Sequence, residues 1–436
     1  MTQEYLQNQF RTRLSDLPGT AAVRAARENA MSSFNAVGYP TRKLEDWRYT
    51  DLKLLATGEF DPIPGVPPKS AASRTQQLID DLGLSSENSP IVFVDGHPLA
   101  GNQTPTSQNG LEILSLAEAW GSAEDLAADN EFDGRPLAAL NTAFAVNGAC
   151  LRVADGTRID QPIHLIFISS ERPYVAPQPR IIIDLGPGSA LRVVEHFIGS
   201  ADCPAWTNVV TQISQGPHSE LVLYRLQEHG RAHLHTELLT AKLAEDAKLK
   251  LGYVDLGGKL VRNDIHVDLA SPQASCDLFG LFMAAEGQHI DNHIRVDHTA
   301  PRTVSRETFR GIIGDRGRGV FNGKVVVHRD AQKIDATQSS DNLLLSDRAE
   351  IDTKPELEIY ADDVKCSHGA TVGQLDDNQL FYLRSRGLDD ETARGLLTFA
   401  FANAILQRFD MPELKERIIR RVLDHLPGEQ QWEELL

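Results

Sequence analysis

The amino-acid sequence predicts a mainly β protein in which a β-solenoid core is flanked by helical regions at both ends. Two observations predict this class. Residues before 149 and after 385 have the composition and apolar spacing of helices, whereas the residues between them form short runs in which apolar and polar side chains alternate. Turn residues also recur in this middle part at intervals near 30. The predicted regions are residues 1–148, 149–385 and 386–436.

The N-terminal region, residues 1–148, is predicted to be mainly helical. Residues 3–37 are rich in Ala, Arg, Glu, Gln and Leu and are interrupted once, at Pro18-Gly19. Residues 61–75 contain several prolines and serines and are predicted to be a linker. Residues 91–94 are predicted to form a short strand that ends at a turn, and mixed helix follows up to about residue 148.

The core, residues 149–385, shows a repeating unit of strand, tight turn and strand. Turn centres at 187, 217, 246, 272, 316 and 347 give spacings of 30, 29, 26, 44 and 31. A recurrence near 30 residues indicates stacked coils, each of which buries an apolar face on its neighbours. The 44-residue interval holds an extra strand, residues 290–296, and breaks the period. A β-sandwich is the alternative, because its hairpins give a similar alternation.

The C-terminal region, residues 386–436, is predicted to contain two amphipathic helices. The first begins at the acidic residues 389–391, which the helix dipole favours in a first turn. The second begins near Pro412, because proline is tolerated there. Such a pair either caps the open end of a solenoid or binds a partner. Apolar side chains on the two helices include Leu396, Leu397, Phe401, Ile405, Leu414 and Ile418.

Composition excludes several classes of protein. The chain has 43 Lys and Arg against 61 Asp and Glu, a net charge of −18, which argues against nucleic acid as a partner. Its four cysteines are far apart and form no CxxC pair, so a zinc ribbon, a thioredoxin-type site and a self-sufficient four-thiolate cluster are not expected. The N-terminal residues do not resemble a secretory signal, and the longest apolar stretch, residues 396–406, is too short for a membrane span. We expect a cytoplasmic protein without membrane contact.

The sequence contains no nucleotide-binding motif. Its two Gly-Lys pairs, at 258–259 and 323–324, are followed by Leu260 and Val325, so neither completes a Walker A pattern. A GxGxxG dinucleotide motif and a GxSxG nucleophile elbow are also absent. The chain itself is therefore not expected to hydrolyse ATP.

Two histidine pairs have spacings that a metal site could use. His233 and His235 lie two apart and would share one face of a strand, while His289 and His293 lie four apart. A solvated strand face accounts for the first pair as well. The second pair lies in a segment whose polar residues alternate with Ile294 and Val296, which reads as a strand with a polar outer face.

Cys366 and His368 form the most unusual pair in the sequence. On an extended segment they face the same way, and a thiolate with an imidazole suits iron, copper or zinc. Two ligands cannot close a site, so the remaining ligands would come from elsewhere, most economically from another chain. A cysteine that serves only as a small buried apolar residue is the alternative.

The residues around this pair form two long motifs. Residues 364–373 read Val-Lys-Cys-Ser-His-Gly-Ala-Thr-Val-Gly, and residues 379–387 read Gln-Leu-Phe-Tyr-Leu-Arg-Ser-Arg-Gly. These motifs resemble the SufD family of subunits of the Suf iron–sulfur cluster assembly scaffold. Residues 45–50, Glu-Asp-Trp-Arg-Tyr-Thr, and residues 305–311, Ser-Arg-Glu-Thr-Phe-Arg-Gly, add to the resemblance. It extends over essentially the whole chain.

The resemblance implies a right-handed parallel β-helix core between N-terminal and C-terminal helical domains. It also implies pairing with the paralogue SufB through the β-helices and binding of the ATPase SufC through the C-terminal helices, where the six apolar residues named above are the candidate contacts. A transient iron–sulfur cluster would form at the SufB–SufD interface with His368 as a ligand and Cys366 as a weaker candidate.

The main hypothesis is therefore a non-enzymatic scaffold subunit, with ATPase activity in the SufC partner. No stably bound cofactor is expected on the chain alone, while a flavin in the complex and a homodimer of the isolated chain stay open. One alternative is a β-helix enzyme acting on acidic polysaccharide, although a protein with a charge of −18 would repel a polyanion. The other is a purely structural capping subunit.

Overall fold

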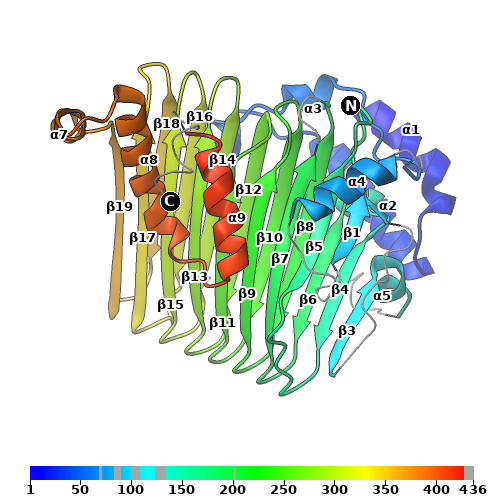
Figure 1. Cartoon of the computed structure of the whole chain (residues 1–436). Helices are drawn as coiled ribbons and strands as arrows, with labels where there is room; N and C mark the ends of the chain where they lie inside the picture. Colours follow the sequence, from blue (N-terminus) through cyan, green and yellow to red (C-terminus); the bar gives the residue numbers. More distant parts are fainter. Residues whose placement is uncertain (68–70, 83–89, 100–108, 123–133, 200–202, 427–436) are drawn as a thin grey trace.

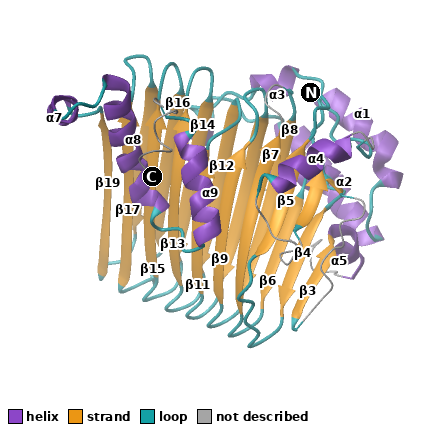
Figure 2. Ribbon diagram, viewed as in Figure 1, coloured by secondary structure: helices purple, strands orange, loops and turns teal. Residues whose placement is uncertain are grey.

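Two sheets of stacked parallel strands face each other along the middle of the chain and form a β-solenoid of about eight turns (Figure 1, Figure 2). The computed structural model describes residues 1–67, 71–82, 90–99, 109–122, 134–199 and 203–426. Parts of the predicted terminal regions, including residues 123–133 and 427–436, lie outside the described residues. Among the described helices, none has the length and hydrophobicity that a membrane crossing requires.

The two sheets are named here by the strand at their shared open end. The β19 sheet contains, in spatial order, β19 (Val364–Gly373), β17 (Ile334–Leu344), β15 (Val304–Ile313), β13 (Ser275–Ala284), β11 (Lys248–Asp255), β9 (Glu220–Glu228), β7 (Ala190–Gly199), β5 (Ile163–Ser169), β1 (Ile91–Val94) and β2 (His97–Pro98). The β18 sheet contains β18 (Glu350–Ile359), β16 (Arg318–Val327), β14 (His289–His298), β12 (Leu260–Leu269), β10 (Leu234–Leu243), β8 (Trp206–Gln215), β6 (Arg180–Leu185), β4 (Gly148–Val153) and β3 (Leu111–Ser115).

Parallel pairing from coil to coil rules out the β-sandwich, whose hairpins would pair antiparallel. Each coil contributes one strand to each sheet, and equivalent residues of neighbouring coils lie side by side in register, as Leu223 does with Leu251 and Leu251 with Leu278. These inward-facing leucines, together with similar side chains of the other strands, fill the interior. The sheets extend into the N-terminal region, because β1 pairs with β5 and β3 pairs with β4.

The break in the 30-residue period that the sequence predicts between residues 272 and 316 is wrong. Turn centres 187, 217, 246 and 272 lie at one edge of the solenoid, whereas 316 and 347 lie between β15 and β16 and between β17 and β18, at the opposite edge. The missing turns of the first edge lie at residues 299–303 and 328–333. Their positive-φ positions hold Arg302 and Lys333, with φ of 62° and 61°. Because these residues rarely mark turns, the sequence conceals them, and β14 is a regular strand.

Helices of the N-terminal region cover the first coils. They are α1 (Gln3–Arg13), α2 (Ala21–Val37), α3 (Lys53–Thr57), α4 (Ala71–Asp80), α5 (Leu116–Ser122) and α6 (Pro136–Phe144), with 3-10 turns η1 (Leu14–Asp16) and η2 (Glu45–Trp47). Thr2 and Thr20 cap α1 and α2, which confirms the interruption at Pro18-Gly19. The predicted linker is wrong at its end, because residues 71–75 belong to α4. The predicted strand at 91–94 is confirmed as β1, with Asp95 and Gly96 in its turn.

The C-terminal helices are α7 (Asp377–Ser385), α8 (Asp390–Leu406) and α9 (Pro412–Leu423). Asp389 caps α8 and Pro412 begins α9, which confirms both predicted starts. Neither helix caps the open end of the solenoid. Instead α8 and α9 lie across the outer face of the β19 sheet (Figure 1), where their apolar sides pack on residues such as Phe279 and Leu281.

The loop between α8 and α9 is tied to the β19 sheet by polar contacts. Asp410 accepts hydrogen bonds from the hydroxyl of Tyr224 at 2.7 Å, from Arg192 at 2.6 Å and from Lys250 at 3.2 Å. The guanidinium of Arg408 pairs with a carboxylate of the same sheet and lies 4.6 Å over the ring of Phe279. These contacts fix the direction in which α9 leaves α8.

Candidate functional site

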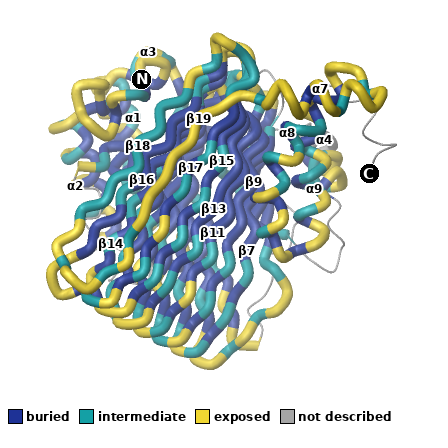
Figure 3. Tube along the Cα trace, turned by 90° about the vertical axis from the view of Figure 1, so that its left-hand side faces the viewer, coloured by how far each residue is buried: buried dark blue, intermediate teal, exposed yellow. Residues whose placement is uncertain are grey.

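The last coil of the solenoid, formed by β18 and β19, is the candidate site. Each strand ends the order of its sheet, so its outer edge has no neighbouring strand in the described part of the chain. Residues along β19 are mostly exposed, as Figure 3 shows for this edge strand. Of the large apolar side chains that are exposed among the described residues, five gather at this end: Ile359, Tyr360, Val372, Phe381 and Tyr382.

Cys366 and His368 lie on β19 and face the same side of the strand, as the sequence predicts. Cys366 is half-buried beside Ala336, its register partner on β17, whereas His368 is exposed and has Gln338 as its register partner. Partial burial raises the pKa of the Cys366 thiol, so the thiol is protonated at neutral pH. Of these two potential metal-binding groups, the imidazole is therefore the accessible one.

These two side chains do not make a closed metal site by themselves. Among the described residues, no three His, Cys, Asp or Glu side chains are grouped so that they could hold a metal ion. Cys150 on β4 and Cys276 on β13 are buried as small apolar residues. Burial raises the pKa of Cys150 to about 11. A site that uses His368 would take its further ligands from outside the described residues.

The interpretation of His233 and His235 as a solvated strand face is wrong. Both are buried, 2% and 0% exposed, and burial lowers the pKa of each. The ring of His233 stacks on that of His229 with centroids 3.7 Å apart, and His235 lies near the buried ion pair between Arg225 and Glu237. These histidines belong to a buried polar network rather than to a metal site among the described residues.

The predicted polar outer face around His289 and His293 is also not solvated. Residues 45–50 cover it: Trp47 stacks under the guanidinium of Arg262 at 4.3 Å, and Thr50 donates a hydrogen bond to Asp291. Asp291 is fully buried and also pairs with Arg262 at 2.7 Å. Residues 45–50, which contribute to the family resemblance, thus anchor the N-terminal region on the β18 sheet.

Five of the six apolar residues predicted to bind an ATPase pack within the chain. Ile405, Leu414 and Ile418 are buried against the β19 sheet, and Leu396 and Phe401 are half-buried in the same cluster, while Leu397 is half-buried on α8. A partner cannot reach the three buried side chains unless α8 and α9 leave the sheet. Within the described C-terminal helices, the exposed aromatic residues are Phe381 and Tyr382 on α7, 74% and 56% exposed. Both lie in the 379–387 motif, where two adjacent aromatic residues on a short polar helix are a signal of a binding surface that composition and periodicity do not assign.

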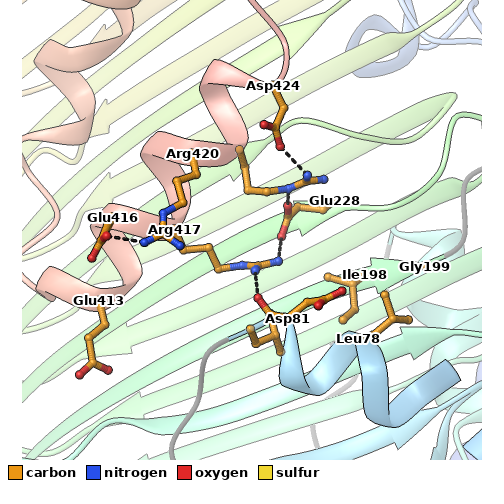
Figure 4. A pocket seen from close by; sticks show the side chains of 12 residues that line it. Leu78, Asp81, Ile198, Gly199, Glu228, Glu413, Glu416, Arg417, Arg420 and Asp424 are labelled. Carbon is orange, nitrogen blue, oxygen red and sulfur yellow. Dashed lines mark hydrogen bonds and ion pairs between the residues drawn. The ribbon is translucent and has the colours of Figure 1, made fainter. Parts of the chain in front are cut away.

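A groove of about 650 Å³ lies where α4 and α9 meet over the β19 sheet (Figure 4). Arg417 donates to the backbone carbonyl of Asp81 at 2.8 Å and to Glu228 at 2.9 Å, and Arg421 pairs with the same Glu228. Arg420 pairs with Glu416. All three arginines have carboxylate partners, so the groove joins the N-terminal and C-terminal helices and does not present free positive charge.

Comparison with known proteins decides the family. Residues 3–165 match the family model described as SufBD protein N-terminal region, and residues 167–401 match the model described as SUF system FeS cluster assembly, SufBD core domain. The chain belongs to the SufBD family. Within the family it is of the SufD type, because it is 32% identical to the iron–sulfur cluster assembly protein SufD of Escherichia coli, over 95% of this chain and 96% of the relative.

Two other relatives match at similar length. A SufBD family iron–sulfur cluster assembly protein of Synechocystis is 30% identical over 90% of this chain and 88% of its own length. Protein ABCI7, chloroplastic, of Arabidopsis thaliana is 28% identical over 91% and 84%. This SufD-type chain therefore has a role in iron–sulfur cluster assembly.

Proposed function

We propose that this chain is a non-enzymatic scaffold subunit that pairs with a SufB-type paralogue through the open end of its solenoid and lends His368 to a transient iron–sulfur cluster between the two subunits. The observation that carries the proposal is the position of His368. It is exposed on the edge strand of the last coil, so its imidazole is accessible at the place where a partner would meet the chain. Imidazole is a suitable iron ligand.

The unpaired edges of β18 and β19 support pairing with another solenoid. An edge strand presents unpaired N–H and C=O groups, which form a template for a further strand. Ile359, Tyr360 and Val372 add exposed apolar surface at the same end. A paralogue with matching edges would continue both sheets across the interface. Two copies of this chain could use the same edges, so a homodimer is the competing species when the paralogue is absent.

Substitution on the edge strand tests this pairing. Val372→Lys places a charge in the proposed interface, and it should abolish co-purification with a co-expressed SufB-type subunit because a buried unpaired charge is costly. Val66→Lys is the control, since Val66 is also exposed but lies in the N-terminal region. Equal recovery of the paralogue with both variants would contradict the proposed interface.

We further propose that a SufC-type ATPase binds the outer surface of the C-terminal helices, with Phe381 and Tyr382 as its main contacts. Figure 1 shows α7 projecting beyond β19, away from the solenoid. Exposed aromatic side chains supply much of the energy of protein interfaces. ATP hydrolysis would reside in this partner, because the chain has no Walker A motif. Motion of the ATPase could then be transmitted through α8 to the last coil.

The double substitution Phe381→Ser with Tyr382→Ser should abolish co-purification with the ATPase while pairing with the paralogue persists. Val37→Ser removes an exposed apolar residue in the N-terminal region and serves as the control. Retention of the ATPase by the double variant would place its binding surface elsewhere. Under this proposal the isolated chain holds no stable cofactor. A flavin, where present, belongs to the complex, and the absorption spectrum of the purified complex reports it.

A further inference from the structure

A row of inward-facing residues changes from apolar to polar as it approaches His368. Val193, Leu223, Leu251 and Leu278 occupy the same register position on successive coils. The last three coils have Glu307, Gln338 and His368 at that position. Neighbouring strands are about 4.8 Å apart, so the three polar side chains form a continuous line that ends at the exposed imidazole.

Gln338 is held in one orientation within this row. It is 1% exposed, and its Nε2 donates a hydrogen bond to Oε2 of Glu307 at 2.8 Å. Its Oε1 is buried and has no hydrogen-bond partner among the described residues. Opposite it, Gly323 makes room for the amide, because a Cβ at that position would lie 2.3 Å from Nε2 of Gln338.

Glu307 determines which end of the amide stays free. Glu307 is 1% exposed, and burial raises the pKa of its carboxyl group to about 8, so the group is mostly protonated at neutral pH and accepts through its unprotonated oxygen. Its Oε2 accepts the amide N–H of Gln338, and this bond leaves Oε1 of Gln338 as an unused acceptor next to the register position of His368. A buried acceptor without a partner is unfavourable, so a donor that reaches it is stabilised there. Glu307 belongs to residues 305–311, which contribute to the family resemblance.

We propose that Gln338 is a positioning residue for His368: its Oε1 accepts the ring N–H of His368, which fixes the tautomer and turns the other ring nitrogen towards the cluster. Histidine ligands usually donate their second N–H to a neighbouring acceptor, which orients the ring and raises its basicity. Glu307 acts one step further back by orienting the amide. The inference rests on the proposed function of His368 as a ligand, and the experiment below separates the two.

The test uses the complex of the full chain with co-expressed SufB-type and SufC-type subunits, reconstituted anaerobically and reduced. Pulsed electron paramagnetic resonance detects the remote nitrogen of a coordinated imidazole, whose quadrupole coupling depends on the hydrogen bond of its N–H. Gln338→Leu should keep the histidine signal but shift the coupling of the remote nitrogen. Loss of a supporting hydrogen bond should also release the cluster to a chelator about 10- to 100-fold faster.

Two further variants give the controls. Asn342→Leu removes another buried amide on the same face of β17 and should leave the remote nitrogen unchanged, because the register partner of Asn342 is Val372. The exchange of Glu307→Gln with Gln338→Glu keeps an acceptor for the imidazole N–H, but a carboxyl oxygen replaces the amide oxygen. Its remote-nitrogen coupling should therefore be that of a hydrogen-bonded imidazole and differ from that of Gln338→Leu. This variant also covers failure of Gln338→Leu to fold.

Three outcomes overturn the inference. If Gln338→Leu leaves the remote nitrogen unchanged while His368→Ala removes the signal, Gln338 is not the partner, although the proposed function of His368 stands. If Asn342→Leu causes the same shift, the effect is one of general packing. If the wild-type complex has no nitrogen signal that His368→Ala removes, the proposed function fails, and the inference fails with it.

Discussion

Loss of Arg262 should release residues 44–52 from the β18 sheet. The guanidinium is 1% exposed and joins two parts of the chain. It donates to the backbone carbonyl of Asp46 at 2.9 Å, pairs with Asp291 at 2.7 Å and with Asp264 at 2.6 Å, and lies 4.3 Å over the ring of Trp47. Arg262→Met keeps most of the side-chain length but removes the charge and all of these hydrogen bonds.

The size of the effect follows from burial. Asp291 is fully buried, and burial by itself would raise the pKa of its carboxyl group, but the positive charge of Arg262 holds that pKa well below the ordinary value. Arg262→Met therefore leaves a buried carboxylate without the charge that stabilises it. Breaking a buried ion pair in this way costs about 3–5 kcal/mol. The contact with the Trp47 ring adds about 1–2 kcal/mol. In a double-mutant cycle, Trp47→Ala and Arg262→Met should therefore show a coupling of about 1–2 kcal/mol.

Hydrogen exchange measured by mass spectrometry suits this prediction, because a chain of this size need not unfold in one step. In Arg262→Met, amides of residues 44–52 and of β12 and β14 should exchange faster, while those of β17 and β19 should not. Arg316→Met is the control, since Arg316 forms an ion pair with Glu286 that is exposed to solvent, and such pairs contribute little to stability. Unchanged exchange at residues 44–52, or a coupling near zero, would refute the role assigned to this contact.

Two further predictions concern the interior. Burial lowers the pKa of His298 to about 4, whereas its unfolded pKa is near 6.5, so its contribution to stability is complete above pH 6.5 and is lost as the pH falls towards 4. His298→Gln should therefore reduce the loss of unfolding free energy between pH 7 and 5 by about 2 kcal/mol in urea titrations. An unchanged dependence of the unfolding free energy on pH would contradict this prediction. Gly323→Ala should displace the Gln338 amide and lower the unfolding free energy by about 1–3 kcal/mol. Gly314→Ala is the control and should change the unfolding free energy little, because no atom lies within 4 Å of the added carbon. Equal effects of the two substitutions would contradict the close contact at Gly323.

The sequence predicts the solenoid because strand alternation and turn spacing are local signals. The placement of individual coils fails where Arg302 and Lys333 occupy left-handed turn positions that glycine or asparagine would normally mark. Strand periodicity suffices to put Cys366 and His368 on one face. It does not reveal the row behind them, because Glu307 and Gln338 are 31 residues apart and Gln338 and His368 are 30 apart, so their alignment depends on the length of every intervening turn.

Burial of polar residues is the other feature that the sequence conceals. His235 and Asp291 alternate with apolar residues as a solvated face would, yet one lies inside the solenoid and the other lies under residues 45–50. Similarly, the helical period identifies the apolar sides of α8 and α9 but not the surface that they cover. That surface is the β19 sheet of the same chain, so Ile405, Leu414 and Ile418 are buried in it.

Cluster content of the co-purified complex tests the central claim most directly. His368→Ala should leave the assembly of the complex intact but remove most of the iron and sulfide, together with the visible absorption, after anaerobic reconstitution. Lys365→Ala, an exposed change on the same strand, should keep both. If the His368→Ala complex holds as much cluster as the wild type, His368 is not a ligand, and the chain contributes only its structure to the scaffold.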